Sequence, residues 1–538
     1  MPAEPSTSSS TRIVHMLEDK QELKCLDAAV GRSKNNKIEL LVQDLKERHP
    51  EVLRKCLKLW EDKQKKKAVI SVDDMKEIFP TVFRKELGCL KDVKINIPIP
   101  EDAKPKFFKP RPVPYALRGR VEVELEKLVS QGVWKKVAYS KWAAPIVVVL
   151  KNARDPSGPI RICGDYKITV NAVAPLDNYP IPNTSDQLAT LAGGSKFSKI
   201  DLSQAYQQVE LDDSSKELLT VNTHRGLYRP DRLQFGVHSA TGMFQREMER
   251  ILDGIPFVLV RIDDVLMTAE SDWDHFIVLI KVLVSLENSG LTVNLKKCNF
   301  FCNQVTFCGY TICKEGVRPM QSNVEAVLNA PEPTNVSEVK SFMGMLNYYQ
   351  NYLPSLASIA EPIHCLLRKG TVWEWGSQQK KAFSVAKKML SEAPLLVHYD
   401  PSKEIVVHTD ASPYGVGSVL SHVYPDNTER PVSYASRSLS VSERNYGHVE
   451  KEGLALVFAV KKFHHFLFGQ KFTIFTDHKP LLGLFGENKA IPERSAARIA
   501  RWALMLSAYD YKLQYRQGEL NGNADALNWT TFRKKRKK

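Results

Sequence analysis

The spacing of apolar residues changes several times along the chain, and each change predicts a different kind of structure. Residues 1–14 are rich in Ser, Thr and Pro, and we expect them to be disordered. Between 15 and 68, apolar positions recur at helical spacing among many Lys and Glu residues, which predicts a small helical region. Residues 69–114 become rich in Pro and Lys from Pro98 onward, so we expect an extended lead-in, because proline disfavours helix.

The remainder of the chain predicts two mixed regions separated by a helical one. Short β-prone runs and helical stretches alternate over 115–313, helical spacing dominates 314–400, and a strand pattern begins again over 401–529. Residues 530–538 form a basic tail. A chain of 538 residues exceeds what one core can hold, so the expected fold class is multidomain, α/β and α+β.

Two adjacent carboxylates, Asp263 and Asp264, stand between apolar runs at 255–260 and 265–267 that read as strands. Consecutive carboxylates reach one edge of a sheet only at a tight turn between strands. Asp201 lies in another short β-prone run, 197–202. Because like charges so close resist joint ionisation without a divalent cation, three carboxylates on neighbouring strand ends predict a Mg²⁺ site for phosphoryl transfer.

Further motifs surround these carboxylates in a fixed order. Leu-Gln-Phe-Gly at 233–236 precedes them, and Gly-Leu-Thr-Val-Asn-Leu-Lys-Lys at 290–297 and Val-Thr-Phe-Cys-Gly-Tyr at 305–310 follow. From about residue 98 to residue 529, the ordered set resembles the reverse transcriptase of gypsy-type LTR retrotransposon polyproteins. The resemblance implies a right-hand polymerase with fingers and palm at 115–313 and thumb-like and connection helices at 314–400.

The same resemblance implies roles for individual residues of the polymerase site. Asp201, Asp263 and Asp264 would hold two Mg²⁺ ions, with Mn²⁺ as an alternative, and Leu202 would add only its backbone carbonyl. Tyr206 would exclude a 2′-hydroxyl, and Lys297 or its neighbour Lys296 would protonate the leaving pyrophosphate. The residues expected at the triphosphate, the nucleotide pocket or the primer terminus are Lys151, Arg161, Phe235, Gly236, Phe307, Cys308 and Gly309.

Four further acids lie in the carboxyl-terminal region. Asp410 and Asp477 end apolar strand-like runs, Glu452 lies in a stretch with helical spacing, and Asp525 stands near the end of the chain. With their flanking residues, these acids resemble the four-carboxylate site of ribonuclease H, although Asn528-Trp529 departs from the pattern after the last motif. The resemblance implies a ribonuclease H-like α/β domain over 401–529, in which two Mg²⁺ ions activate water against an RNA phosphodiester.

Four positions depart from the reverse transcriptase pattern. Arg261 replaces an aromatic residue two positions before Asp263, Gln234 and Thr241 replace prolines, and Pro230 falls inside a predicted strand. We expect the Arg261 guanidinium to compete with Mg²⁺ for the carboxylates, and a strand proline to remove a ladder hydrogen bond. Two functions therefore stay open. One is an RNA-directed DNA polymerase with ribonuclease H activity. The other is a captured or degenerate retroelement protein that binds nucleic acid with its polymerase inactive, with or without a live ribonuclease H.

The net charge of +15 favours a polyanionic partner, and six of the positive charges lie in the run 533–538. Together with the resemblance, this implies an RNA template, a DNA primer, an RNA–DNA hybrid and deoxynucleoside triphosphates as partners. The oligomeric state is not indicated. No apolar run is long enough to span a membrane, and nine scattered cysteines favour reduced thiols, so we expect a cytoplasmic or nuclear location or both.

Three other observations bear on organisation. Residues 25–34 followed by 39–41 are similar to the SAP helix–loop–helix of DNA-binding proteins, with an unrelated helical bundle as the alternative. Cys298, Cys302, Cys308 and Cys313 lack the paired spacing of zinc ligands, which favours structural thiols over a metal site. The sequence carries no aspartic-protease signature, zinc module or integrase segment, so we expect a partial polyprotein or a host-captured fragment.

Overall fold

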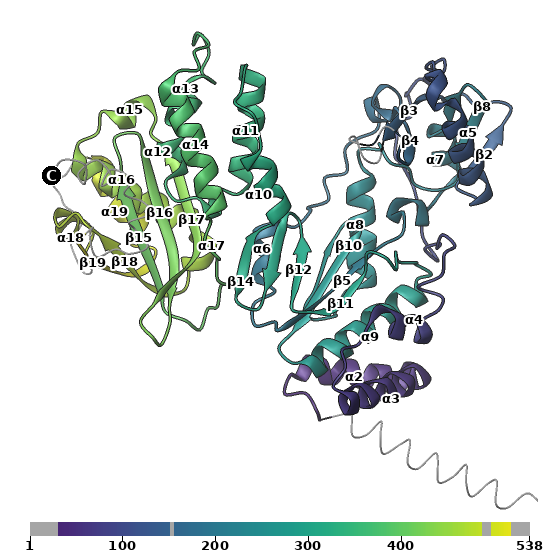
Figure 1. Ribbon diagram of the computed structural model, residues 1–538, viewed down its shortest axis with the longest axis horizontal. Coiled ribbons are helices and arrows are strands. Elements are labelled where there is room, and N and C mark those ends of the chain that lie inside the picture. Colours follow the sequence, from purple (N-terminus) through teal and green to yellow (C-terminus); the bar gives the residue numbers. More distant parts are fainter. Residues whose placement is uncertain (1–30, 151–154, 156, 487–496, 518–538) are drawn as a thin grey trace, which may run out of the picture. The chain divides into compact units, whose positions relative to one another are not determined.

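The computed structural model describes residues 31–150, 155, 157–486 and 497–517, and the chain divides into two compact units, Met1–Val305 and Thr306–Lys538 (Figure 1). The division falls inside the stretch 115–313 that the sequence predicts as one fingers-and-palm region. The chain divides at this point because the strands that follow pair with one another and not with the sheets of the first unit. Strands β12 (Gln304–Phe307), β13 (Tyr310–Cys313) and β14 (Gly316–Pro319) form a three-stranded sheet of their own.

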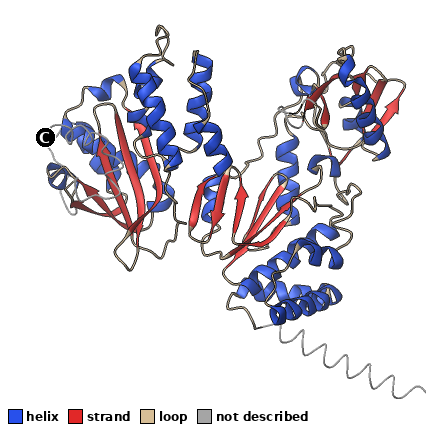
Figure 2. Ribbon diagram, in the orientation of Figure 1, coloured by secondary structure: helices blue, strands red, loops and turns tan. Residues whose placement is uncertain are grey.

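A four-stranded antiparallel sheet forms the centre of the first unit (Figure 2). Its strands, in order, are β11 (Asn299–Cys302), β5 (Lys196–Asp201), β10 (Asp264–Ala269) and β9 (Val258–Arg261). Helix α9 (Asp272–Asn288) packs on β5 and β10, because its sequence is mostly apolar and most of its side chains are buried. Helix α8 (Ala240–Ile251) packs on β9. These two helices fix the strands whose ends carry the first set of acids.

A five-stranded sheet lies in the same unit. Its strands, in order, are β2 (Trp134–Val137), β8 (Gly226–Pro230), β7 (Val221–Thr223), β3 (Ala144–Leu150) and β4 (Ile160–Gly164). Helices α5 (Tyr115–Ser130) and α7 (Asp213–Leu218) pack against it. The smaller elements of this unit are β1 (Lys94–Ile95), which pairs with β6 (Glu210–Leu211), helix α6 (Thr184–Ala189), and the 3₁₀ helices Tyr166–Ile168, Val170–Ala172 and Ala205–Gln208.

Helices α2 (Asn36–Arg48) and α3 (Pro50–Lys66) lie in the stretch predicted as helical, and they belong to the same compact unit as α9. Trp60 of α3 stacks on Phe276 with ring centroids 4.9 Å apart, and it meets Trp273 edge-on at 5.4 Å. The three rings therefore join the amino-terminal helices to the helix that supports the central sheet. The first part of the SAP-like motif, residues 25–30, lies outside the described residues.

The extended lead-in predicted for 69–114 is wrong at its start, where helix α4 (Val72–Ile78) forms. The Ser71 hydroxyl accepts a hydrogen bond from the Asp74 backbone at 3.2 Å, and the Asp74 carboxylate accepts one from the Ser71 backbone at 2.7 Å. This capping box satisfies two backbone donors, and Met75 is fully buried. The prediction followed the proline content from Pro98 onward and missed the Ser-x-x-Asp signal at 71–74.

The second unit begins with the three-stranded sheet and continues as helices. They are α10 (Gln321–Leu328), α11 (Val336–Tyr348), the 3₁₀ helix Gln350–Tyr352, α12 (Leu356–Ile359), α13 (Glu361–Cys365) and α14 (Ser377–Ser391). In α11 and α14 the buried residues recur at helical spacing, so each helix presents one apolar face. In the part of the chain that the structure describes, no helix combines the length and the apolar character needed to cross a membrane.

A five-stranded sheet completes the second unit. Its strands, in order, are β17 (Glu429–Ser438), β16 (Gly415–Val423), β15 (Ile405–Ala411), β18 (Lys471–Thr476) and β19 (Asp510–Tyr515). Strands β15 and β18 are parallel, whereas β16 pairs antiparallel with both β15 and β17. Helix α16 (His448–Lys462) packs on β15 and β16. The other helices are α15 (Val441–Arg444), α17 (His464–Leu467), α18 (Pro480–Phe485) and α19 (Ala497–Leu506).

His275 of α9 is fully buried beneath the central sheet of the first unit, and burial lowers its pKa to about 3. Its Nε2 lies 2.7 Å from the Ser198 hydroxyl of β5, which also accepts a hydrogen bond from Phe301 N at 3.0 Å. The folded state therefore resists protonation of His275, whereas the unfolded chain takes up this proton near pH 6.5. Below that pH the unfolded state binds more protons, so acid removes stability.

We expect the free energy of unfolding to fall by about 1.4 kcal/mol per pH unit through His275 as the pH is lowered from about 6.5 towards 3. Urea unfolding at several pH values, for the wild type and for His275→Asn, measures this contribution as a difference between two slopes. The variant should have the shallower slope. Parallel slopes would show that His275 does not govern acid sensitivity.

Candidate active sites

The first three acids meet at the turn between β9 and β10. In the antiparallel register, Asp264 stands directly opposite Asp201 of β5 and opposite Arg261 of β9. The turn residues between them are Ile262, whose φ of 57° is left-handed, and Asp263, which is exposed. Leu202 N donates to Asp263 O at 3.0 Å, so the backbone after Asp201 is tied to the turn. The strand ends therefore gather all three carboxylates, as the sequence pattern predicts.

Two lysines pair with these carboxylates. Lys297 Nζ donates to Asp201 Oδ2 at 3.1 Å, and Lys199 Nζ donates to Asp264 Oδ2 at 2.9 Å. Burial raises the pKa of Asp201, the hydrogen bond and charge of Lys297 oppose that rise, and the charges of Asp264 and Asp263 add to it. Two ammonium groups therefore lie against these acids and supply positive charge to them.

Gln245 of α8 holds the turn, and sequence reasoning did not assign it this role. It is fully buried, its Oε1 accepts a hydrogen bond from Ile262 N at 2.6 Å, and its Nε2 donates to Val260 O at 3.0 Å. A buried amide bonded on both sides of a strained turn fixes its geometry. The available signal was a polar Gln on the apolar face of a predicted helix.

The expectation that Arg261 competes for the carboxylates is wrong. Its Nη1 donates to Pro182 O at 3.1 Å and to Gln187 Oε1 at 3.3 Å. The register places Arg261 and Asp264 on the same face of the sheet, so it is the hydrogen bonds to Pro182 and Gln187 that direct the guanidinium away from the acids. Among the described residues, Lys199 and Lys297 are cations that do contact the acids.

The other departures also have partners within the fold. Gln234 is buried, accepts a hydrogen bond from Trp134 Nε1 at 2.9 Å and donates to Arg232 O at 2.7 Å. Thr241 Oγ1 lies 3.1 Å from the Tyr206 hydroxyl. Pro230 is the last residue of β8, and Asp231 N donates to Val133 O at 2.9 Å, so backbone pairing continues directly after the proline. The expected loss from a proline in a strand interior is therefore not incurred.

Most residues predicted to form the nucleotide pocket lie together. Tyr206 meets Phe235 edge-on with ring centroids 5.1 Å apart, and the Arg161 guanidinium lies over the Phe235 ring at 4.3 Å. Gly236 has a φ of +95°, and an added Cβ would lie 3.1 Å from Gly164 O. Burial raises the pKa of Tyr206, with a smaller rise from the charge of Asp263, so this cluster adjoins the acids. Lys151 lies outside the described residues.

In the second unit, the turn at 307–309 is held by two tyrosines. Tyr349 Oη donates to Gly309 O at 3.0 Å, and Tyr348 Oη donates to Cys308 O. Gly309 has a φ of +75°, and an added Cβ would lie 3.2 Å from Tyr349 Oη. Phe307 is buried. The turn that the sequence assigns to the primer terminus is therefore fixed by hydroxyl groups from the helical segment that follows it.

Three of the four remaining acids come together at one edge of the second unit's larger sheet. Asp410 lies in β15, Asp477 directly follows the parallel strand β18, and Glu452 lies on the helix α16 that covers β15. Parallel strands bring their carboxyl ends to one edge, which accounts for the approach of Asp410 and Asp477. Asp525 lies outside the described residues.

Burial and mutual repulsion dominate the electrostatics of this trio. Burial raises the pKa of Asp410 to about 6, and the charge of Asp477 adds to the rise. Burial raises the pKa of Glu452 to about 9, with further contributions from Asp410 and Asp477. Among the described residues, Glu452 Oε2 has no hydrogen-bond partner although it is buried. An uncompensated buried carboxylate oxygen beside two other acids is suited to a divalent cation.

Within the described residues, no group of three or more His, Cys, Asp or Glu side chains already has the geometry of a metal centre. In the first site, Lys199 and Lys297 take up carboxylate oxygens that a metal ion would need. In the second site, the fourth predicted ligand, Asp525, is outside the described range. The donor sets consist of hard carboxylate oxygens, which fit Mg²⁺ and Mn²⁺ better than softer metals.

Comparison with protein families identifies the class. Residues 151–312 match the reverse transcriptase (RNA-dependent DNA polymerase) family, and residues 400–509 match the RNase H-like domain found in reverse transcriptase. The chain therefore belongs to the reverse transcriptases that carry a ribonuclease H-like domain, and the resemblance seen in its motifs is confirmed. Domains of these two kinds generally use divalent metal ions.

Among curated proteins, the chain is similar to the transposon Tf2-3 and Tf2-4 polyproteins of Schizosaccharomyces pombe, each 34% identical over 390 residues and 72% of this chain. The matched part covers 29% of the length of each of those polyproteins. Among solved structures, the foamy viral protease-reverse transcriptase in complex with dsDNA has a TM-score of 0.72 at 21% identity, covering 92% of this chain and 97% of that one. The same viral protein in complex with RNA/DNA hybrid has a TM-score of 0.66 at 19% identity, covering 96% of this chain and 64% of that one. These structural likenesses establish the fold.

We expect Arg261→Tyr to leave single-nucleotide incorporation within about twofold of the parent, because the guanidinium bonds Pro182 and Gln187 and not the carboxylates.

Gln245→Ala should lower incorporation on the order of tenfold, because it releases the turn that carries Asp263. Rates are measured at saturating Mg²⁺ on an RNA template, with Asp263→Asn/Asp264→Asn as the blank. A gain of tenfold or more for Arg261→Tyr would revive the competition hypothesis.

Proposed function

We propose that this chain copies RNA into DNA at Asp201, Asp263 and Asp264, and hydrolyses the RNA strand of RNA–DNA hybrids at Asp410, Glu452, Asp477 and Asp525. The observation that carries the proposal is the register that sets Asp264 directly opposite Asp201 beside the exposed Asp263. It brings three hard oxygen donors to one strand edge, within a family whose members are reverse transcriptases. The role of each residue is proposed on its geometry and on its place in the motifs.

In the polymerase site, two Mg²⁺ ions, or Mn²⁺, would activate the primer 3′-hydroxyl and neutralise the leaving pyrophosphate. Asp201 and Asp264 would turn from their lysine partners to the metals, with the Leu202 carbonyl beside them. Lys297 is the more direct candidate to protonate pyrophosphate, since its side chain is 62% exposed and its Nζ lies 3.1 Å from Asp201 Oδ2. Tyr206, packed against Phe235 and bonded to Thr241, is rigid enough to exclude a 2′-hydroxyl.

In the nuclease site, the paired metal ions would supply an activated water and charge for the transition state. The chain contributes acids that are already oriented. Glu452 is 2% exposed and is fixed on the first turns of α16, and Asp410 is fixed by seven ladder positions between β15 and β16. The raised pKa of Glu452, about 9, supports a site in which a cation must replace protons for all the acids to ionise.

The proposed partners are an RNA template, a DNA primer, an RNA–DNA hybrid and deoxynucleoside triphosphates. The net charge of +15 supports a polyanionic partner. Arg161 beside the nucleotide pocket offers a guanidinium for the triphosphate. We also propose a cytoplasmic or nuclear location or both, on the basic run 533–538, which lies outside the described residues.

The alternative of a nucleic-acid-binding protein with an inactive polymerase rested on Arg261, Gln234, Thr241 and Pro230. Each of these residues has a partner or a strand-end position within the fold that leaves the acids unobstructed. This observation favours a live polymerase over the alternative.

The two activities should separate by mutation. Asp410→Asn should abolish hydrolysis of the RNA strand and leave primer extension within about twofold, because the acids belong to different compact units. Asp263→Asn/Asp264→Asn should do the reverse. Both reactions are followed on one labelled RNA–DNA substrate with Mg²⁺.

Wild-type protein without primer extension would refute the polymerase, and wild-type protein without cleavage would refute the nuclease. Cleavage that persists in Asp410→Asn would remove this residue from the site. Chelation by EDTA, followed by Mg²⁺ or Mn²⁺ alone, serves as the matched control, because both activities should vanish and return together.

A further inference from the structure

A hairpin turn in the second unit connects β15, which carries Asp410, to β16. Ser412, two residues after Asp410, organises the turn: its hydroxyl accepts hydrogen bonds from Gly415 N at 2.9 Å and Tyr414 N at 3.3 Å. Ser412 N donates to Gly415 O at 2.8 Å, and Leu439 N donates to Tyr414 O at 2.8 Å. The position of Asp410 therefore depends on how this turn, residues 412–415, is held.

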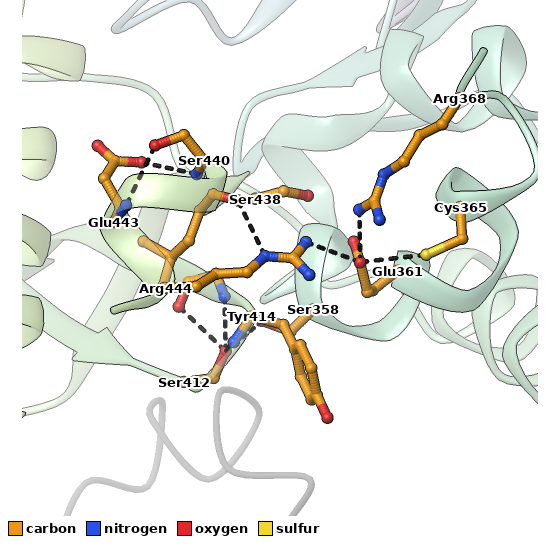
Figure 3. Close-up of polar contacts among 12 residues, drawn as sticks. Ser358, Glu361, Cys365, Arg368, Ser412, Tyr414, Ser438, Ser440, Glu443 and Arg444 are labelled. Atoms are coloured by element: carbon orange, nitrogen blue, oxygen red, sulfur yellow. Dashed lines mark hydrogen bonds and ion pairs between the residues drawn. The ribbon is translucent and has the colours of Figure 1, made fainter. Parts of the chain in front are cut away.

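The turn is contacted by a helix from outside the domain that matches ribonuclease H. Ser358 of α12 shares a hydrogen bond of 2.7 Å between its hydroxyl and that of Ser412 (Figure 3). A Cβ on Gly415 would lie 2.8 Å from Ser358 Oγ, so the helix approaches the turn as closely as a glycine permits. Either hydroxyl can be the donor in this bond, and the Ser412 hydroxyl also lies 3.0 Å from Gly415 O.

A second contact lies beside the first. Glu361 of α13 is 7% exposed, and its Oε1 accepts hydrogen bonds from Arg368 Nη2 at 2.7 Å and from Arg444 Nη2 at 2.8 Å. Figure 3 shows the guanidinium groups of Arg444 and Arg368 both directed at the Glu361 carboxylate. Arg444 also donates to Leu439 O at 3.3 Å, and Leu439 N is bonded to Tyr414 O. Glu361 thus reaches the same turn through Arg444.

Glu361 stays ionised although it is buried. Burial alone would raise its pKa, but the hydrogen bonds from Arg444, Cys365 and Arg368 lower it below the usual range, so the group is an anion held between two cations. Such a contact is costly to break from one side, because it leaves a buried charge without its partner. Helices α12 and α13, which precede the ribonuclease H-like domain in the sequence, therefore contact the region of the 412–415 turn through Ser358 and Glu361.

We propose that Ser358 and Glu361 are positioning residues for the nuclease, which hold the 412–415 turn and through it Asp410. The inference rests on the proposed ribonuclease H function of the site. It makes α12 and α13 part of the nuclease itself, although the family match to that domain begins only at residue 400.

The test uses the full chain. Ser358→Ala should lower kcat for hybrid cleavage on the order of tenfold, with little change in KM and with primer extension unchanged, because the turn moves while substrate binding elsewhere persists. Ser358→Thr retains the hydroxyl and should restore cleavage. The double variant Ser358→Ala/Ser412→Ala should be no slower than Ser412→Ala alone, because the two residues act through one hydrogen bond. Glu361→Gln should also lower kcat.

Ser391→Ala and Glu392→Gln are the matched controls, since both positions are exposed at the end of α14 in the same helical segment. They should leave cleavage unchanged. Cleavage by Ser358→Ala and Glu361→Gln at the rate of these controls would overturn the proposal. So would a loss that Ser358→Thr fails to restore, or a parallel loss of primer extension, because each would indicate a role in folding only.

Amide hydrogen exchange separates this inference from the proposed function. Ser358→Ala should speed exchange at the backbone amides of Tyr414 and Gly415, which bond the Ser412 hydroxyl, whether or not the protein cleaves hybrid. Unchanged exchange there would overturn the inference even in an active nuclease. Wild-type protein that cleaves no hybrid, yet shows faster exchange in the variant, would refute the proposed nuclease and not the contact.

Discussion

Repulsion between neighbouring carboxylates is the constraint on which both sites depend. Asp201 and Asp264 face each other across two strands, and Asp410, Glu452 and Asp477 converge from two parallel strands and a helix. Gathering acids in this way costs free energy unless cations compensate it. In the first site, Lys199 and Lys297 pair with the acids and supply positive charge. In the second site, one oxygen of Glu452 has no hydrogen-bond partner among the described residues.

Acids that repel one another stay in place because the elements beneath them cannot move easily. Helix α9 is buried along most of its length under the first set, and α16 packs on the strand that carries Asp410. Polar contacts add direction to this apolar support. Gln245 bonds both sides of the β9–β10 turn, and Ser198 joins β5 to His275 of α9. The apolar packing supplies the stability, and these few hydrogen bonds fix the geometry.

The residues that depart from the family pattern in the polymerase region are also held by specific partners or positions in the fold. A buried polar group is tolerated when its hydrogen bonds are satisfied, as Gln234 is by Trp134 and Arg232. A guanidinium is tolerated beside the acids when backbone and amide oxygens hold it elsewhere, as with Arg261. A proline is tolerated at a strand end, as with Pro230. A departure from a family pattern is therefore judged by the partner of the side chain, which the pattern does not contain.

The sequence by itself predicted the class of protein and its two family domains, and it predicted the groups of acids that the structure brings together, Asp201, Asp263 and Asp264 in one and Asp410, Glu452 and Asp477 in the other. This was possible because strand ends, an Asp-Asp turn and helical spacing are local features, each visible within a short segment of the sequence. It did not determine where Arg261 points, how Gln245 holds the turn, or that α4 forms at 72–78. The first two depend on residues far apart in sequence, and the third on a capping box that composition obscures. The division near Val305 and the fastening of the 412–415 turn by Ser358 were decided only in three dimensions, because strand pairing and side-chain contact between distant segments leave no periodic trace in the chain.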